Sequence, residues 1–248
     1  TLNPTSVAGT VSANQAICSG TSPANITLTG STGTIQWQSS ANVTDYTNIS
    51  GATAASLTSA QMGSLNATTY YRAVVTSGVC SAATSGVVTV TVTTAPNAGS
   101  ITGTQDICTN GSTTFSSNGD NGGTWTSGTQ GVATVNGSTG AVTPVSAGTS
   151  TITYTVTGTG GCLNATATRT VTVYDLPTAT ASNGFSCGSG AVTLYASNVS
   201  TGATTDWYAS ATGGSPLASG VGQFTTPVIS TTTSYFVEAR NITAGCVS

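Results

Sequence analysis

The chain of 248 residues contains no histidine and no lysine, and its charged residues are three arginines and six acids. Without histidine, the sequence excludes Ser-His-Asp and Cys-His catalysis and histidine metal sites. Without lysine, it excludes a Schiff base, a P-loop and a lysine–asparagine isopeptide crosslink. A net charge of −3 with three positive side chains leaves no footprint for nucleic acid or acidic lipid. We therefore expect no enzymatic activity, no cofactor, no metal ion and no nucleic-acid partner.

The chain also lacks an apolar run of 18 residues, so we expect no membrane insertion. No signal peptide is visible at Thr1, as expected for an internal fragment. Threonine, serine and glycine are abundant, with 54, 33 and 31 residues. Threonine is β-branched and favours strands, and a hydrophobic content of 37% suffices for several small cores. The composition therefore predicts folded β-structure rather than disorder.

A threefold internal repeat organises the chain. The segment "GTVSANQAICSG" (9–20) recurs as "GSITGTQDICTNG" (99–111) and more loosely as "TATASNGFSCGSG" (178–190). Each copy precedes an alternating strand, a strand with one tryptophan, a strand with aromatic residues and a turn with a second cysteine. No segment has a sustained 3.6-residue apolar period, so we expect no helix.

Seven or so short strands per repeat, with cysteine, tryptophan and cysteine in that order, predict an Ig-like β-sandwich. The expected fold class is all-β, with tandem Ig-like β-sandwich domains arranged as an extended rod, because short linkers that contain proline are stiff. The expected domains are 1–94, 95–175 and 176–248. Residues 1–5 are expected to be the tail of a preceding domain, and the third domain to lack its last strand. Each core should contain one tryptophan: Trp37, Trp125 and Trp207.

Two cysteines per repeat predict disulfide bonds in an exported protein. They are Cys18, Cys80, Cys108, Cys162, Cys187 and Cys246. Zinc binding is the weaker interpretation, because the sequence has no C-x-x-C spacing and no histidine.

Two patterns of cysteine pairing compete. Pairing within each domain would give Cys18–Cys80, Cys108–Cys162 and Cys187–Cys246. The expected strand order opposes this, because it puts Cys18 and Cys80 in turns at opposite ends of a sandwich. Strands of about six or seven residues separate those ends by roughly 20 Å, whereas a disulfide needs Cα atoms within about 7 Å. Head-to-tail stacking favours Cys18–Cys162 and Cys108–Cys246, with Cys80 and Cys187 bonded to neighbours beyond this chain; pairing within domains stays open.

Several segments resemble known Ig-like modules. The segment "WYASATGGSPLASGVGQFTTPVISTTTSYFVEARNITAGC" (207–246) is similar to Ig-like modules of secreted Bacteroidetes surface proteins. The segment "GVATVNGSTGAVTPVSAGTSTITYTV" (131–156) resembles bacterial group-2 Ig-like domains. The stretch from "WQSSANVTDY" to "YYRAVVTSGVCSAA" (37–83) resembles repeats of very long flavobacterial adhesins, of which the SprB-like giant gliding-motility adhesins are the closest type.

This resemblance implies a function that composition alone does not give. It implies export by type IX secretion, an extracellular location on the cell surface, and a repeat segment of a long adhesin filament that acts in attachment and gliding motility. The implied partners are neighbouring Ig-like repeats of the same chain, surface polysaccharide or an abiotic surface, and the gliding motor at the cell envelope. Similar repeats also occur in multidomain polysaccharide-degrading enzymes. A spacer or carbohydrate-binding accessory module of such an enzyme, or a surface-layer or sheath component, is therefore the alternative.

Other candidate sites have plainer interpretations, which we prefer. Asp206 and Glu238 could form a glycosidase pair, but isolated surface charges, or a weak ion pair near Arg240, are expected instead. The loop around Asp120 lacks the several oxygen ligands of a calcium site and should be a turn.

Asparagines in Asn-x-Ser/Thr sequences and two aromatic pairs are the remaining candidates. The nine asparagines exceed the chance number only modestly, so glycosylation is not indicated. They are Asn25, Asn42, Asn48, Asn66, Asn110, Asn136, Asn164, Asn198 and Asn241. In the pairs Tyr70–Tyr71 and Trp207–Tyr208, one ring should enter the core and the other should face outward, where it could stack on a sugar.

Overall fold

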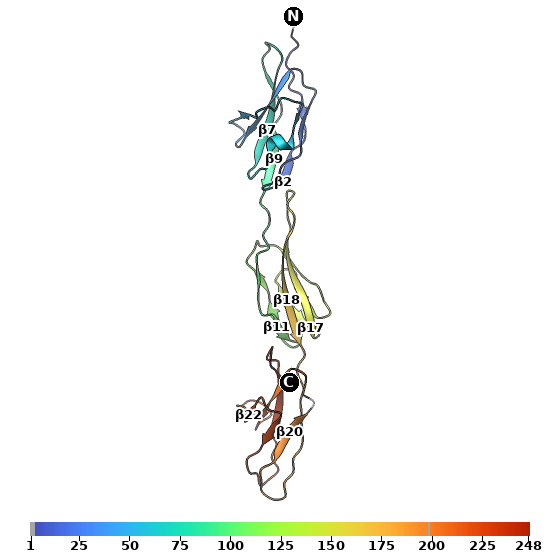
Figure 1. Ribbon diagram of the computed structural model, residues 1–248, viewed down its shortest axis with the longest axis vertical. Coiled ribbons are helices and arrows are strands. Elements are labelled where there is room, and N and C mark those ends of the chain that lie inside the picture. Colours follow the sequence, from blue (N-terminus) through green and yellow to red (C-terminus); the bar gives the residue numbers. More distant parts are fainter. Residues whose placement is uncertain (1–2, 198) are drawn as a thin grey trace. The chain divides into compact units, whose positions relative to one another are not determined.

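The computed structural model describes residues 3–197 and 199–248 (Figure 1). The fold is all-β, as predicted, and its sheets pack as sandwiches. The sheets form three sets that share no strand, which we call the first sandwich (β1–β9), the second sandwich (β10–β18) and the third sandwich (β19–β24). No helix in the described part of the chain is long and apolar enough to cross a membrane.

The chain divides into two compact units. Unit 1 contains Thr1–Asn97 together with Val156–Ala165, and unit 2 contains Ala98–Thr155 and Thr166–Ser248. The loop 156–165, which joins two strands of the second sandwich, is therefore grouped with the first sandwich. The boundaries 1–94, 95–175 and 176–248 stay a prediction, since this division follows contacts rather than repeats.

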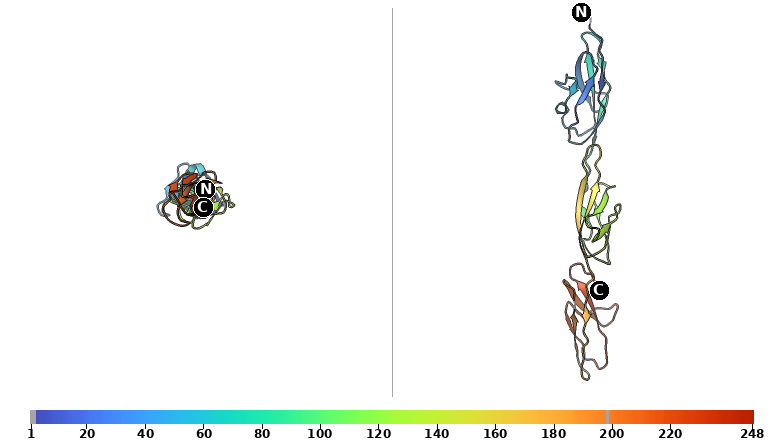
Figure 2. Two further views of the ribbon diagram at one scale, coloured as in Figure 1. Left: turned by 90° about the horizontal axis from the view of Figure 1, so that it is seen from below. Right: turned by 90° about the vertical axis from the view of Figure 1, so that its right-hand side faces the viewer.

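The first sandwich packs a large sheet, in the order β2-β9-β7-β4-β5 with β8 beside β7, against a small sheet, in the order β1-β3-β6. Its strands are β1 (Thr10–Val11), β2 (Gln15–Cys18), β3 (Ile26–Thr29), β4 (Thr34–Ser40), β5 (Thr47–Asn48), β6 (Ser56–Leu57), β7 (Thr69–Thr76), β8 (Ala83–Thr84) and β9 (Val88–Thr93). Side chains along β7 alternate between buried and half-buried, because successive side chains of a strand point to opposite faces of the sheet. Most strands run along the length of the sandwich, so turns gather at its two ends (Figures 1 and 2).

One helical turn, α1 (Ser59–Met62), interrupts this sandwich. The expectation that the chain has no helix is wrong to this extent. Thr58 caps the turn: its hydroxyl accepts from the Gln61 backbone N–H, and the Gln61 side chain accepts from the Thr58 N–H. The buried Met62 holds the turn on the core. Such a capping box needs only four residues, too few to produce an apolar period.

The second sandwich has a four-stranded sheet in the order β11-β18-β17-β14, a three-stranded sheet β12-β16-β15, and the pair β10-β13. Its strands are β10 (Ile101–Thr102), β11 (Asp106–Cys108), β12 (Thr113–Thr114), β13 (Ser116–Ser117), β14 (Thr124–Ser127), β15 (Ala133–Val135), β16 (Ala141–Pro144), β17 (Gly148–Val156) and β18 (Ala165–Tyr174). Phe115 and Ile152 are fully buried, and Trp125 lies 4.6 Å from Tyr154 between ring centroids.

The third sandwich has two three-stranded sheets, β19-β20-β23 and β22-β21-β24. Its strands are β19 (Thr180–Ala181), β20 (Thr193–Ser197), β21 (Ala203–Tyr208), β22 (Ala218–Ser219), β23 (Gln223–Thr225) and β24 (Phe236–Asn241). The core is built around Trp207, which is fully buried and stacks on Phe224 at 5.9 Å. Within the described residues of this sandwich, no strand corresponds to β9 or β18.

Candidate functional site

A disulfide joins Cys18 to Cys162, with an S–S distance of 2.07 Å and Cα atoms 4.7 Å apart. Cys18 ends β2, which pairs in parallel with β9 so that Cys18 lies opposite Thr93. Cys162 lies on the loop between β17 and β18. The bond therefore links a strand end of the first sandwich to a loop of the second. This is the pairing that the strand-order argument favours, and the alternative bond between Cys18 and Cys80 is not formed.

Two glycines allow the loop to approach the first sandwich closely. Gly160 and Gly161 both have positive φ, of 57° and 84°, a conformation that glycine adopts without strain. A Cβ at Gly160 would collide with the Thr93 side chain, and a Cβ at Gly161 would lie 3.5 Å from the Ile17 Cα. The Cys162 sulfur also lies 3.5 Å from the Thr93 carbonyl oxygen. The loop thus seats on β2 and the end of β9, where the disulfide closes.

The second disulfide, Cys108–Cys246, repeats the arrangement with an S–S distance of 2.09 Å and Cα atoms 5.6 Å apart. Cys108 ends β11, which runs parallel to β18 with Cys108 opposite Tyr174. The next residue donates its N–H to the Tyr174 carbonyl at 2.9 Å, just as Ser19 does to Thr93. Cys246 lies in the turn after β24 and is 2% exposed. Strand order again favours this pair.

The structure leaves two cysteines unbonded, Cys80 and Cys187. Cys80 is half-buried, and its thiol lies 3.5 Å from the Pro4 carbonyl oxygen. Cys187 is exposed on a bend. That both bond to cysteines beyond this chain stays a prediction.

The three tryptophans are buried in their sandwiches. Trp37 and Trp207 are fully buried and Trp125 is 6% exposed. The indole N–H of Trp37 donates to the Ala54 carbonyl at 2.9 Å, and that of Trp207 to the Val221 carbonyl at 3.2 Å. A buried ring with its polar atom satisfied is a core residue rather than a ligand-binding platform.

Asp206 is not the surface charge that we expected. It is 5% exposed, accepts the Gly220 N–H at 2.9 Å and forms an ion pair with Arg240 at 3.1 Å. Burial alone would raise its pKa, but the hydrogen bonds from Arg240 and Gly220 outweigh burial and lower the pKa below its usual value. Glu238 lies opposite Asp206 on β24 and accepts the Tyr208 hydroxyl at 3.1 Å. Both carboxylates thus bond side chains within the sheet. The general acid of a glycosidase needs a raised pKa, whereas the pKa of Asp206 is lowered.

The loop around Asp120 is a turn closed on Tyr154. The Tyr154 hydroxyl donates to the Asp120 carbonyl at 2.8 Å and accepts the Gly123 N–H at 2.9 Å. Among the residues described, no three histidine, cysteine or acidic side chains lie close enough to hold a metal ion.

Turn chemistry accounts for several of the Asn-x-Ser/Thr sequences. The side-chain oxygens of Asn42, Asn136 and Asn241 each accept the backbone N–H groups of the residues two and three positions later. Asparagine favours such turns because its side chain hydrogen-bonds the backbone two residues on. Asn198, another of the nine, lies outside the described residues. At these three positions the asparagine therefore has a structural role in its turn.

In each aromatic pair one ring lies in the core, as predicted, and the other is half-buried instead of facing fully outward. Tyr71 is 2% exposed and Trp207 is fully buried, whereas Tyr70 and Tyr208 are half-buried. Burial raises the pKa of Tyr71. Burial, followed by the hydrogen bond to Glu238, raises that of Tyr208. The Tyr208 hydroxyl thus already has a hydrogen-bond partner in Glu238.

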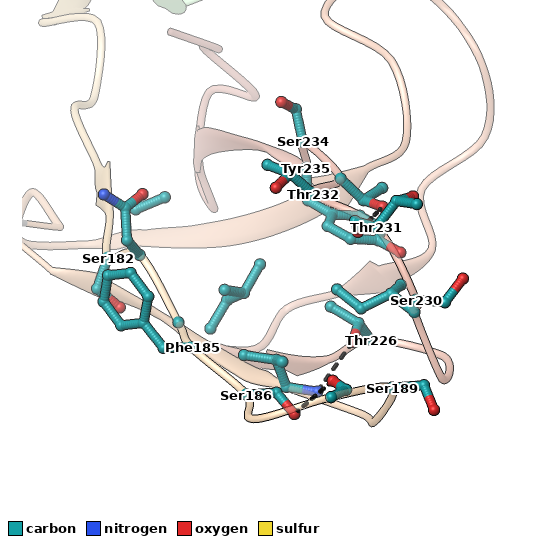
Figure 3. Close-up of a pocket in the computed structure, with 18 residues that line it drawn as sticks. Ser182, Phe185, Ser186, Ser189, Thr226, Ser230, Thr231, Thr232, Ser234 and Tyr235 are labelled. Carbon is teal, nitrogen blue, oxygen red and sulfur yellow. Dashed lines mark hydrogen bonds between the residues drawn. The ribbon is translucent and has the colours of Figure 1, made fainter.

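A cavity of about 720 Å³ opens in the third sandwich, which sequence reasoning missed. Ser182 and Phe185 lie on one side of it, and Thr231, Thr232 and Tyr235 on the other (Figure 3).

The first sandwich explains this cavity. There β9 lies between β2 and β7, and its Val92 N–H donates to the hydroxyl of Thr68, just before β7. By repeat alignment, residues 184–187 correspond to β2 and the segment before β24 to the region of Thr68. The cavity therefore lies at the position that β9 occupies in the first sandwich.

Comparisons with known proteins agree with this architecture. Residues 7–94 match a family described as "Domain of unknown function (DUF8696)", and residues 175–248 match one described as "Ig-like domain CHU_C associated". No curated protein matches the chain in sequence.

Similar solved structures include the FN1–FN3 domains of chicken CNTN1, at 11% identity over 99% of this chain and 95% of that one, with a TM-score of 0.26. The fibronectin(III)-like modules of Clostridium thermocellum CbhA share 14% identity over 66% of this chain and 94% of that one, with a TM-score of 0.29. A SusE-like surface-located polysaccharide-binding protein from the Bacteroides thetaiotaomicron heparin utilisation locus shares 12% identity over 85% of this chain and 44% of that one, with a TM-score of 0.28. Values this low say nothing about function.

The disulfides and the matched module define the protein in general terms. Disulfides persist in oxidising compartments outside the cytosol, which indicates an extracellular protein. Ig-like domains are typically non-catalytic structural modules. The chain is therefore an array of Ig-like β-sandwiches, a structural repeat or accessory module of an extracellular protein, whose third sandwich is similar to the CHU_C-associated Ig-like domains.

Proposed function

We propose that the chain is a repeat segment of a long cell-surface adhesin filament that acts in attachment and gliding motility. Its role is that of a structural stalk, without catalysis. One observation carries the proposal: each disulfide joins the end of a strand in one sandwich to a turn in the next. Successive sandwiches are therefore connected twice, once by the peptide linker and once by a disulfide.

A double connection suits a filament under tension. A peptide linker alone would leave each junction with a single covalent path to bear the load when the filament is pulled. The Cys18–Cys162 bond adds a second covalent path at the first junction, and Cys108–Cys246 adds one at the second. A filament dragged across a surface by a motor needs such junctions, whereas a passive spacer needs only a linker.

The composition supports an exposed location. Charged residues make up 4% of the chain, so few contacts are screened by salt or titrated by mild pH changes. The resemblance to Bacteroidetes adhesin repeats supports type IX secretion, the gliding motor as a partner, and surface polysaccharide or an abiotic surface as the target.

Bead tracking on living source cells tests the proposal. Beads coated with antibody against this chain should bind the cell surface and travel along it. Beads coated with an unrelated antibody from the same host species are the control and should not bind. Beads that bind and remain stationary on gliding cells would contradict a role in gliding. They would favour a static stalk, a sheath component or a spacer of a polysaccharide-degrading enzyme.

A further inference from the structure

We infer that Cys80 and Cys187 form a directional joint between two copies of this chain: the turn that carries Cys80 docks on the Cys187 end of another copy and closes a disulfide there. This inference rests on the arrangement of the two formed disulfides and does not depend on gliding. Within the chain, the cysteine that ends the first motif of each repeat bonds the turn cysteine of the following repeat. Cys187 and Cys80 hold these same two positions and are unbonded.

The Cys80 turn is built like the Cys162 turn that has already docked. Gly78 and Gly160 occupy equivalent places two residues before the cysteine, with φ of 55° and 57°. A Cβ at Gly160 would collide with Thr93, at the end of β9, and a Cβ at Gly78 would collide with Asn3. The turn therefore already lies against the segment that corresponds to the end of a last strand.

The sulfur atoms are placed alike as well. The Cys162 sulfur lies 3.5 Å from the Thr93 carbonyl oxygen, and the Cys80 sulfur lies 3.5 Å from the Pro4 carbonyl oxygen. In the formed joint, Thr93 also accepts the Ser19 N–H, which follows Cys18. A docking copy thus brings both the cysteine and the strand end beside which the partner cysteine lies.

Exposed apolar side chains mark both halves of the joint. Val79, next to Cys80, is 95% exposed, and Phe185, two residues before Cys187, is 91% exposed. In the formed joint their counterparts, Gly161 and Ala16, are in contact: a Cβ at Gly161 would lie 3.4 Å from the Ala16 carbonyl oxygen. Gly161 and Ala16 stay exposed in the formed joint, but contact between the larger Val79 and Phe185 side chains would remove part of their apolar surface from water, which favours the joint.

The chemistry is thiol–disulfide exchange with a small oxidised disulfide such as oxidised glutathione. The Cys187 thiolate attacks oxidised glutathione, forms a mixed disulfide and releases one glutathione thiolate. The Cys80 thiolate of the second copy then attacks the Cys187 sulfur and releases the second. Two protein thiols and one oxidised glutathione thus give one protein disulfide and two reduced glutathione molecules.

The test uses purified chain in a glutathione redox buffer, analysed on non-reducing gels. The unmodified chain should form a ladder of dimers, trimers and longer species. Cys80→Ser and Cys187→Ser variants should each stay monomeric alone and form a single dimer when mixed. Dimers of either variant alone, in the same yield as the mixture, would overturn the inference.

Peptide mapping identifies the bond directly. Cleavage before each aspartate gives six peptides with one cysteine each, and Cys80 and Cys187 fall on peptides 45–105 and 175–205. The mixed Cys80–Cys187 peptide should exceed each symmetric peptide by at least about tenfold. Random collision gives only about a twofold excess, and that result would refute a specific joint.

Variants that keep both thiols separate docking from simple thiol reactivity. Phe185→Ser and Val79→Ser should each slow dimer formation by roughly tenfold, because each removes an apolar contact from the joint. Val228→Ser and Val145→Ser, at positions 74% and 56% exposed, are matched controls and should leave the rate unchanged. Equal rates for Phe185→Ser and Val228→Ser would overturn the docking surface.

Discussion

Removing the Cys18–Cys162 bond should destabilise the first sandwich far more than removing an unpaired cysteine. With the bond intact, an unfolded first sandwich is still held at Cys18 and again at its linker near Asn97. The closed loop between these points has roughly 80 residues, for which the chain-entropy model gives about 4.5 kcal/mol at 25 °C. The stabilisation measured for disulfides is often smaller than this model gives. We therefore expect the free energy of unfolding of the Cys18→Ser/Cys162→Ser variant to fall by about 2–4.5 kcal/mol.

Hydrogen exchange measured by mass spectrometry can report the loss of stability for each sandwich separately. Amides in β7 of the first sandwich, whose alternate side chains are buried, should exchange by unfolding of that sandwich and report its free energy. Calorimetry should show its unfolding temperature lowered by roughly 8–36 °C, at about 4–8 °C per kcal/mol for a domain of this size. Cys80→Ser makes the same chemical change at an unbonded cysteine and should shift stability by less than about 0.5 kcal/mol.

Two results would refute this reasoning. The first is equal stability of the double variant and Cys80→Ser, which would mean that the bond constrains no loop. The second is a peptide map of the unmodified chain in which the Cys18 peptide, 1–44, is joined to the Cys80 peptide, 45–105, instead of the Cys162 peptide, 120–174. The map reads connectivity without any variant, so it separates a wrong pairing from a wrong energy.

Three further predictions concern the sandwiches themselves. Leu57→Ala, at a fully buried position, should cost about 2–5 kcal/mol in urea unfolding, whereas Leu163→Ala, at a position 88% exposed, should cost less than about 0.5 kcal/mol. Gly140→Ala should destabilise the second sandwich more than Gly122→Ala: both glycines have positive φ, but a Cβ at Gly140 would collide with the Phe115 carbonyl oxygen, while a Cβ at Gly122 would meet nothing. Because the Asp206 pKa is lowered on folding, its contribution to stability is present above its unfolded pKa of about 3.9 and is lost as the pH falls through the lowered value. Asp206→Asn should therefore weaken the third sandwich at neutral pH and flatten its stability profile below about pH 4, as followed by circular dichroism.

The strand order and the cysteine positions could be predicted from sequence because they follow local patterns. Cysteine, tryptophan and aromatic strands recur in a fixed order, and this order alone places Cys18 and Cys80 at opposite ends. The parallel pairing of β2 with β9 could not be predicted from such local patterns. The segment 9–20 predicts one strand followed by a turn, yet it forms β1, antiparallel to β3, and β2, parallel to β9. Cys18 consequently ends a strand instead of lying in a turn, because a partner distant in sequence decides where a short strand continues.

The burial of Asp206 could not be predicted either, because it also depends on a partner distant in sequence. On its strand it precedes Trp207 in an otherwise uncharged sequence, which predicts an exposed position. Its burial depends on Arg240, which lies on β24 two residues beyond the residue directly opposite Asp206. Register between strands sets that diagonal contact, and no local pattern contains it. The cavity of the third sandwich was missed for a related reason, since it reflects the absence of a paired strand among the described residues.

The placement of the cysteines gives the array a direction. A bond within one sandwich would use both of its cysteines and leave neighbouring repeats connected by the linker alone. In the observed pattern, the second sandwich uses Cys162 at one junction and Cys108 at the other. Each repeat therefore contributes one strand-end cysteine and one turn cysteine to different junctions. Both formed joints pair a strand-end cysteine with a turn cysteine, never two strand ends or two turns. Any number of such repeats can then be joined in one orientation only, and every junction has the same covalent support.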